Sequence, residues 1–180
     1  GHGEPLSSQL SPPDGSQFCG MMFGKPDDYF LLSTSAGYGF VTRLGDLQSK
    51  NRKGKVVLKL SKGAEVLTPV AVSDIVHDWV ALAGSAGHFL VYSIEELPVM
   101  ARGKGVKLIN IPTKKFEAGE EKMAAVMAFR DGQKLLVHAG KRYRRLKSAE
   151  MDDYWGARAQ RGRLLPKGYR QVDKILIEKK

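Results

Sequence analysis

The chain has 180 residues, a net charge of +10 and a single cysteine, Cys19. This length can bury one sizeable hydrophobic core, and a lone thiol excludes an internal disulfide or a Cys-x-x-Cys metal site. The sequence contains no apolar run of about 18 residues, so we expect no transmembrane helix. With no signal peptide and no initiating Met, we expect a piece of a longer, cytoplasmic protein.

Short apolar runs, rich in β-branched and aromatic residues and separated by Gly, Pro or Asp-Gly, predict an all-β fold. In chain order, strands are expected at 18–23, 29–33, 38–43, 56–60, 66–72, 79–83, 89–94, 106–111, 123–129, 134–138, 143–146 and 172–177. The turn at 130–132 predicts that the strands on either side of it form a hairpin. Short helical segments are expected within 114–122 and 148–158.

A three-part pattern recurs along the chain: an Ala-Gly turn, an alternating apolar run and a basic box centred on glycine. The turns at Gly37, Gly87 and Gly140 are 50 and 53 residues apart. The first, second and third boxes lie at 51–55, 101–105 and 160–163, and a weaker one without Lys or Arg opens the chain at 1–6. Such a period in a chain of short strands is typical of propeller-like blades.

We therefore expect residues 1–180 to form one domain, a partial ring of about three blades and a terminal half-unit. The expected repeat units are 1–50, 51–100, 101–157 and 158–180. A single four-stranded unit cannot bury both of its faces, so the units must stack around an axis.

Positive charge is concentrated in the second half of the chain. Residues 98–180 hold 21 Lys and Arg against 9 Asp and Glu, a net of +12, whereas residues 1–97 hold 8 against 10, a net of −2. This asymmetry favours a polyanionic partner on one side of the molecule. A basic surface that only aids solubility is the alternative.

The boxes are candidate phosphate-binding sites. Glycine lets main-chain N–H groups approach an anion, and Lys or Arg side chains neutralise phosphates. Repetition at equivalent positions of stacked units places the charge along a rim, which suits a bent duplex held by its backbone with little base specificity. The candidate DNA-binding residues of the boxes are Lys50, Arg52, Lys53, Lys55, Arg102, Lys104, Lys107, Arg158, Arg161 and Arg163.

The densest positive run, at 141–147, adds four candidate DNA-binding residues: Lys141, Arg142, Arg144 and Arg145. A charged edge strand that resists aggregation is the alternative interpretation of this run. Tyr143, in its middle, is expected to pack inward rather than to stack outward.

Three stretches together carry a family resemblance. The order AGYGFV…DLQSKNRKGK, then AGHFLVYSIEELP…ARGKGVKLINIP, then HAGKRYRRL…RGRLL resembles the C-terminal domain of ParC, the A-type subunit of topoisomerase IV. It is more distantly similar to that of DNA gyrase A. The resemblance covers essentially the whole chain and implies a β-pinwheel, in which neighbouring blades exchange a strand. It also implies a module that binds and bends duplex DNA beside the catalytic core of a type IIA topoisomerase.

The resemblance implies a bacterial, chromosome-associated setting, with the ParC core, the B-type subunit of topoisomerase IV and the condensin complex as partners. The gyrase box Gln-Arg-Arg-Gly-Gly-Arg/Lys-Gly is present only in degenerate forms, which favours topoisomerase IV over gyrase. The family's active-site tyrosine and metal-binding residues belong to other domains or to the other type of subunit. We therefore expect no catalytic residue, metal or cofactor in this chain, and no membrane partner.

A propeller-type platform that docks an acidic or chromosome-organising protein through its basic rim is the competing function. An independent enzyme is disfavoured, because no GxxxxGK[ST] loop is present and His77-Asp78 has no second His-Asp pair to complete a metal motif. The adjacent carboxylates Asp27-Asp28 and Asp152-Asp153 are unsuited to act as an acid/base pair.

Overall fold

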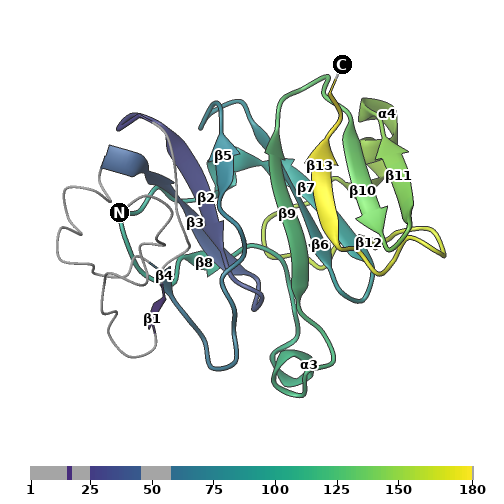
Figure 1. The fold of residues 1–180 in the computed structure, drawn as a ribbon, viewed down its shortest axis with the longest axis horizontal. Coiled ribbons are helices and arrows are strands. Elements are labelled where there is room, and N and C mark those ends of the chain that lie inside the picture. The colour runs from purple at the N-terminus through teal and green to yellow at the C-terminus, as the bar shows by residue number, and fades with distance from the viewer. Residues whose placement is uncertain (1–15, 18–24, 46–57, 180) are drawn as a thin grey trace.

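The computed structural model describes residues 16–17, 25–45 and 58–179 (Figure 1). In this part of the chain antiparallel sheets dominate and the helices are short, which confirms the all-β prediction. None of the described helices is long and apolar enough to cross a membrane. Expectations for 1–15, 18–24 and 46–57, which include Cys19, the weak opening box and the first box, fall outside the described residues.

The strands are β1 (Ser16–Gln17), β2 (Tyr29–Ser33), β3 (Tyr38–Arg43), β4 (Leu58–Lys59), β5 (Val70–Val72), β6 (Trp79–Gly84), β7 (His88–Ser93), β8 (Val106–Lys107), β9 (Met123–Phe129), β10 (Leu135–Ala139), β11 (Arg142–Leu146), β12 (Arg163–Leu164) and β13 (Lys174–Ile177). The helical segments are η1 (Ile94–Glu96), α3 (Thr113–Glu117), α4 (Ser148–Met151) and η2 (Asp152–Tyr154). Each strand expected wholly within the described residues is present, and α3 and α4 lie close to the two expected helical segments.

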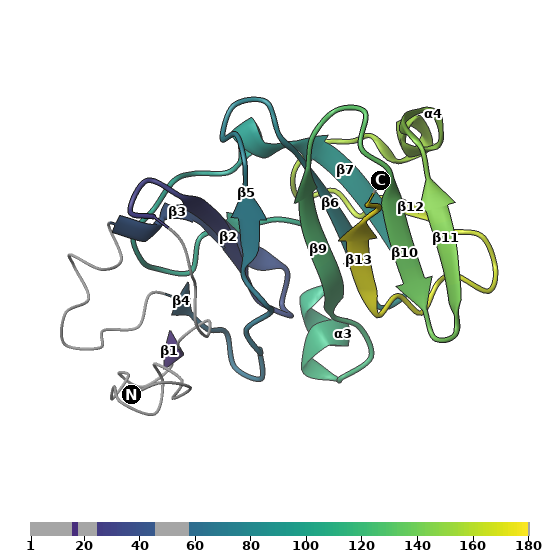
Figure 2. The same cartoon turned by 45° about the horizontal axis from the view of Figure 1, so that its top comes forward.

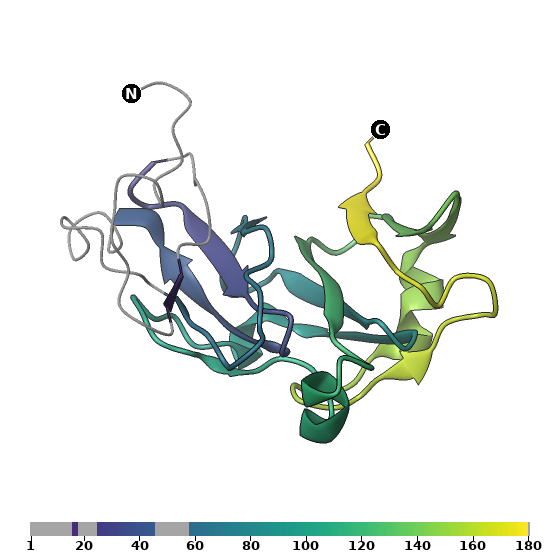
Figure 3. The same ribbon diagram turned by 60° about the horizontal axis from the view of Figure 1, so that its bottom comes forward.

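Three blade-like sheets follow one another along the chain. Their strand orders, from the inner to the outer edge, are β5-β2-β3-β8, β9-β6-β7-β12 and β13-β10-β11. A separate pair is formed by β1 and β4. Figure 3 shows the sheets fanning out between the N-terminal and the C-terminal side of the molecule. The inner strands β5, β9 and β13 are therefore equivalent, and so are the outer strands β8 and β12.

The outer strands complete the sheet that precedes them. β8 follows β7 in the chain but pairs with β3, through Tyr38↔Lys107 and Gly39↔Val106. β12 follows β11 but pairs with β7, through His88↔Leu164 and Phe89↔Arg163. This exchange of strands between neighbouring sheets is the feature expected of a β-pinwheel.

Stacking of the sheets builds the core. Leu82 and Tyr92 belong to an apolar cluster between the first and second sheets, and Phe89 and Val137 to one between the second and third. β2, β3, β6 and β7 are buried on both faces, whereas burial in β10 alternates along the strand. The third sheet therefore has one face in the core and one face exposed.

The expected hairpin between 123–129 and 134–138 is wrong. β9 pairs with β6, and β10 pairs with β11 and β13, so the turn at 130–132 carries the chain from the second sheet to the third. The turn residues specify a reversal of the chain, and a reversal does not require both flanking strands to share one sheet. The inner edge of β6 is open after the β6–β7 hairpin, and β9 occupies it.

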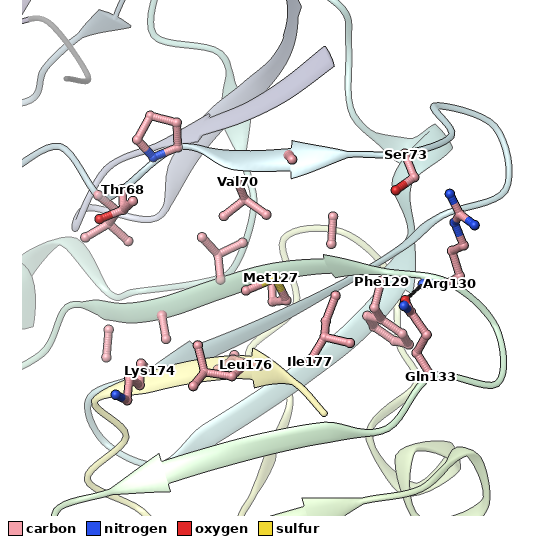
Figure 4. A pocket seen from close by; sticks show the side chains of 18 of the residues that line it. Thr68, Val70, Ser73, Met127, Phe129, Arg130, Gln133, Lys174, Leu176 and Ile177 are labelled. Carbon is pink, nitrogen blue, oxygen red and sulfur yellow. Dashed lines mark hydrogen bonds between the residues drawn. The ribbon is translucent and has the colours of Figure 1, made fainter. Parts of the chain in front are cut away.

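The inner strands β5, β9 and β13 follow one another across the molecule (Figure 2). A groove of about 840 Å³ lies between them (Figure 4). Its lining is mainly apolar and includes Val70, Met127 and Leu176, with Arg130 and Gln133 at one end (Figure 4). None of the candidate DNA-binding residues that the structure describes lines it. The groove and the boxes therefore lie at opposite edges of the sheets.

Candidate nucleic-acid interface

The second and third boxes dock on the preceding sheet through equivalent glycines. Gly105 and Gly162 have positive φ angles of 81° and 85°. A Cβ at Gly105 would collide with the carbonyl oxygen of Gly39, and one at Gly162 with that of Phe89. The box glycine is therefore required both for its backbone conformation and for close approach to the neighbouring strand.

The segments that leave the boxes are held by the Ala-Gly turns. Leu108 N–H donates to the carbonyl of Gly37 at 2.6 Å, and Leu165 N–H donates to that of Gly87 at 2.9 Å. Both leucine side chains are fully buried. The shared hydrogen bond explains why turns and boxes recur together in the sequence.

The third Ala-Gly turn differs from the first two. Five residues separate Ser33 from its partner Gly39, and five separate Ala83 from Phe89, but only Gly140 and Lys141 separate Ala139 from Arg142. Among the described residues, no strand pairs with the outer edge of β11. The third sheet thus differs from the other two in its shorter turn and in its outer edge, where the other two sheets each pair with an exchanged box strand.

Each described box lies beside the segment that follows the preceding box in the chain. Lys59 N–H donates to the carbonyl of Gly103 at 2.8 Å, and Asn110 N–H donates to the carbonyl of Gln160 at 2.9 Å. Lys59 lies four residues after the first box and Asn110 five residues after the second, so the segment that follows one box touches the next box. The described boxes form one contiguous track along the outer edges of the sheets, which we call the rim.

The cations of the second box face solvent. Arg102 and Lys104 are exposed and Lys107 is half-buried, and none of the three makes an ion pair with a described residue. The Lys104 ammonium lies 4.2 Å from the centre of the Tyr38 ring, a cation–π contact. The expected exposure of Arg102 and Lys104 at an outer sheet edge is confirmed.

The cations of the third box are held by the protein itself, with one exception. The Arg161 Nη2 donates to Glu121 Oε1 at 2.7 Å, and the Glu121 side chain is only 3% exposed. Arg158 Nη1 donates to the carbonyl of Lys107 at 2.9 Å, which ties the third box to the second. Arg163, on β12, is exposed and has no described ion-pair partner.

The basic hairpin strand β11 lies beside the segment that follows the third box. Lys141, Arg142 and Arg145 are exposed and Arg144 is half-buried. Arg145 Nη2 lies 2.7 Å from Glu178 Oε1, and Arg144 Nη2 lies 4.0 Å from Glu150 Oε2.

The expectation that Tyr143 packs inward is wrong, because its side chain is 54% exposed and its ring leans against His138. Side chains alternate between the two faces of the sheet along β11. Tyr143 therefore lies on the exposed face of the third sheet, and Leu146 lies on the buried face.

Two histidines have shifted pKa values of opposite sign. Burial lowers the pKa of His88, and the positive charges of Arg161, Lys115 and Arg170 act in the same direction, against the opposing charge of Glu121. The hydrogen bond with the Asp74 carboxylate raises the pKa of the exposed His77 and lowers that of Asp74 to about 2. No group of three or more His, Cys, Asp or Glu that could hold a metal ion occurs in the described ranges.

Three residues that contact the box cations were not predicted from the sequence: Tyr38, His88 and Glu121. Tyr38 and His88 each follow an Ala-Gly turn directly and are 50 residues apart, so the repeat spacing could have paired them with the boxes. Glu121 stands in a polar segment with no pattern that links it to Arg161. Lys50, Arg52, Lys53 and Lys55 lie among the residues that the structure does not describe.

A family model for the DNA gyrase C-terminal domain, a beta-propeller, matches residues 28–73 and 78–130 of this chain. The chain belongs to this family. The matched residues include both longer Ala-Gly turns, the second box and strands β2 to β9, so the exchanged outer strand β8 lies inside the family region.

Within the family, the chain is most simply compared with the A-type subunits of DNA topoisomerase 4. It is 38% identical over 178 residues to that of Pseudomonas aeruginosa, 34% identical over 178 residues to that of Escherichia coli, and 36% identical over 174 residues to that of Neisseria gonorrhoeae. These alignments cover 99%, 99% and 92% of the chain but 24%, 23% and 22% of the relatives. The chain thus spans about a quarter of the length of the curated relatives it matches.

Solved structures give the same picture. The E. coli ParC C-terminal domain superposes with a TM-score of 0.81 at 33% identity, covering 99% of this chain and 71% of that one. A DNA gyrase A C-terminal domain superposes with a TM-score of 0.67 at 17% identity, covering 89% of this chain and 52% of that one, and supports the fold alone. The family and the β-pinwheel fold predicted from the sequence are confirmed.

Proposed function

We propose that the chain is a non-catalytic module of a type IIA topoisomerase, part of its ParC-like subunit, which binds duplex DNA through the rim. In the intact enzyme it would act beside the ParC core and the B-type subunit, and would influence which DNA topologies are relaxed or decatenated. The observation that carries the proposal is the contiguity of the second and third boxes, because hydrogen bonds join the segment that follows the second box to the third box and so bring their cations into one track. Family membership and the topoisomerase IV relatives support it.

The proposed contact set is narrower than the set of candidate residues. Side chains in solvent can reach phosphates at little cost, whereas cations already paired inside the protein cannot do so without breaking those pairs. Among the described residues, we retain six as proposed phosphate contacts: Arg102, Lys104, Lys107, Arg163, Lys141 and Arg142. Arg144 and Arg145 hold acidic partners at the protein surface and are weaker candidates.

Duplex binding is tested by titrating salt. The six retained contacts would give a slope of roughly −5 in log affinity against log salt concentration. The triple variant Arg102→Glu, Lys104→Glu and Lys107→Glu should weaken binding to all duplex sequences alike and leave the fold intact. A flat salt dependence of the unmodified chain would contradict backbone binding.

A matched control separates rim contacts from net charge. Arg130, Lys134 and Lys179 are exposed cations near the turn that follows the inner strand β9, across the second sheet from its box strand β12. Their exchange for Glu changes the net charge by the same amount as the rim variant. Only the rim variant should lose most of its affinity at low salt, and equal losses in the two variants would remove the rim from the binding surface.

A second candidate function is favoured by the open face of the third sheet. Tyr143 is 54% exposed and Leu176 38% exposed on this face, and Arg145 and Lys174 stand next to them. An exposed apolar centre framed by cations suits an acidic protein surface, with the condensin complex as the candidate partner. The double variant Tyr143→Ala and Leu176→Ala should abolish binding of such a protein and leave the salt slope for duplex DNA unchanged.

A further inference from the structure

The cation that precedes the box glycine touches the same structural position in both described boxes. Lys104, before Gly105, lies over the ring of Tyr38. Arg161, before Gly162, donates through Nε to the Nε2 atom of His88 at 3.3 Å. In each case the ring belongs to the residue that follows an Ala-Gly turn, on the strand that receives the exchanged strand.

Arg161 makes a second, stronger contact that Lys104 does not make. Its guanidinium pairs with Glu121 at 2.7 Å, and the Glu121 side chain is almost completely buried. A buried carboxylate needs a partner, because an unpaired charge in a water-poor site is very unfavourable. Arg161 is therefore the ion-pair partner of Glu121 inside the fold.

Glu121 precedes the strand on the opposite edge of the same sheet. The next residue, Lys122, exchanges hydrogen bonds with the turn at 84–88: Lys122 N–H donates to Ser85 Oγ at 2.9 Å, and Ser85 N–H donates to the carbonyl of Lys122 at 2.8 Å. The chain then enters β9 at Met123. Arg161 thus joins three segments: the third box with its exchanged strand β12, the turn at 84–88 on which that strand docks, and the residues that lead into the inner strand β9.

We propose that Arg161 is a positioning residue, which locks the third box onto the second sheet and sets the direction of the rim, and that it does not contact DNA phosphate. The part of this inference that concerns DNA rests on the proposed function, because the direction of the rim affects DNA only if DNA binds along the rim. Lys104 occupies the equivalent position but is exposed and has no buried acid, so its ammonium stays available to phosphate.

The test compares Arg161→Gln with Arg163→Gln in the 180-residue chain. Arg161→Gln leaves Glu121 buried and unpaired, so the melting temperature should fall by about 10 °C. Arg163→Gln should leave the melting temperature unchanged and make the salt slope for duplex binding shallower by about 0.9. Arg161→Gln should also change the bend of a bound duplex, measured by energy transfer between dyes at its ends.

A third variant keeps the proposal testable if Arg161→Gln does not fold. The doubly neutral variant Arg161→Gln with Glu121→Gln removes both charges together, so it should recover most of the melting temperature. Its salt slope should equal that of the unmodified chain. A slope shallower by about 0.9 would show that Arg161 contacts phosphate and would overturn the proposal.

Two further outcomes are decisive. A melting temperature of Arg161→Gln equal to that of the unmodified chain would refute the lock, and an unchanged duplex bend in folded Arg161→Gln would refute the control of rim direction. If the unmodified chain binds no duplex, the proposed function fails, while the melting temperatures of the three variants still decide whether Arg161 locks the box.

Discussion

The second and third boxes have the same backbone and different surroundings. In both, a glycine with positive φ lies against a carbonyl of the neighbouring strand. The leucine three residues after that glycine donates its N–H to an Ala-Gly turn. The cation before that glycine is exposed in the second box and paired with a buried carboxylate in the third. The comparison teaches that the glycine is the shared structural element of the box, whereas the role of its cations differs from unit to unit.

The largest expected effect concerns that shared glycine. Gly162→Ala and Gly105→Ala should each lower the free energy of unfolding by about 3 kcal/mol or more, because both the positive φ and the carbonyl contact oppose a Cβ. Gly132→Ala is the matched control: its φ is also 85°, but open space surrounds the added Cβ, so only about 1 kcal/mol should be lost. Equal losses at Gly132 and Gly162, in urea unfolding, would contradict close docking of the box.

A smaller effect is expected at the hydrogen bond between Tyr92 and the segment that follows the second box. The buried Tyr92 hydroxyl donates to the carbonyl of Leu108 at 2.7 Å, and burial raises the pKa of Tyr92. Tyr92→Phe should cost about 1 kcal/mol, because the carbonyl also accepts from Ala159 N–H and keeps one partner. Chemical denaturation measures the loss, and a cost near zero would mean that the hydroxyl does not hold the β8 segment in place.

The cation of the second box should matter less for stability than that of the third. Lys104→Gln removes an exposed cation–π contact with Tyr38 and should cost about 0.5 kcal/mol. Thermal melts of Lys104→Gln and Arg161→Gln under identical conditions compare the two positions directly. A larger loss at Lys104 than at Arg161 would reverse the distinction between the boxes.

The smallest expected effect is a pH dependence with opposite signs at His88 and His77. The pKa of His88 is lowered in the fold, so its stabilising contribution is complete above its unfolded pKa of about 6.5 and is lost as pH falls through the folded value. The pKa of His77 is raised, so its contribution is complete below about 6.5 and is lost as pH rises through the folded value. Melting curves of His88→Gln and His77→Gln between about pH 5 and 8 should deviate from the unmodified chain in opposite directions.

Local patterns in the sequence determine the elements of this fold. The alternating run that contains β3, the continuous apolar runs of β2 and β6, and the recurrence of turn and box near every 50 residues predicted strands, repeat and family. The pairing of β9 with β6, instead of with β10, followed no local pattern. Strand pairing depends on which sheet edge is left unpaired, and contacts between residues that are distant in the sequence determine which edge that is.

The charges of the boxes are determined by sequence, but their surroundings are decided only by the tertiary structure. A run such as Gln160-Arg161-Gly162-Arg163 shows two arginines with nothing to tell them apart. The exchanged strand points Arg163 to solvent and brings Arg161 within 2.7 Å of Glu121, 40 residues away in the chain. A cation can bind phosphate when it is exposed, and it stabilises the fold when it is buried beside an acidic residue of another segment. Burial decides between the two, because a buried charge needs an oppositely charged partner.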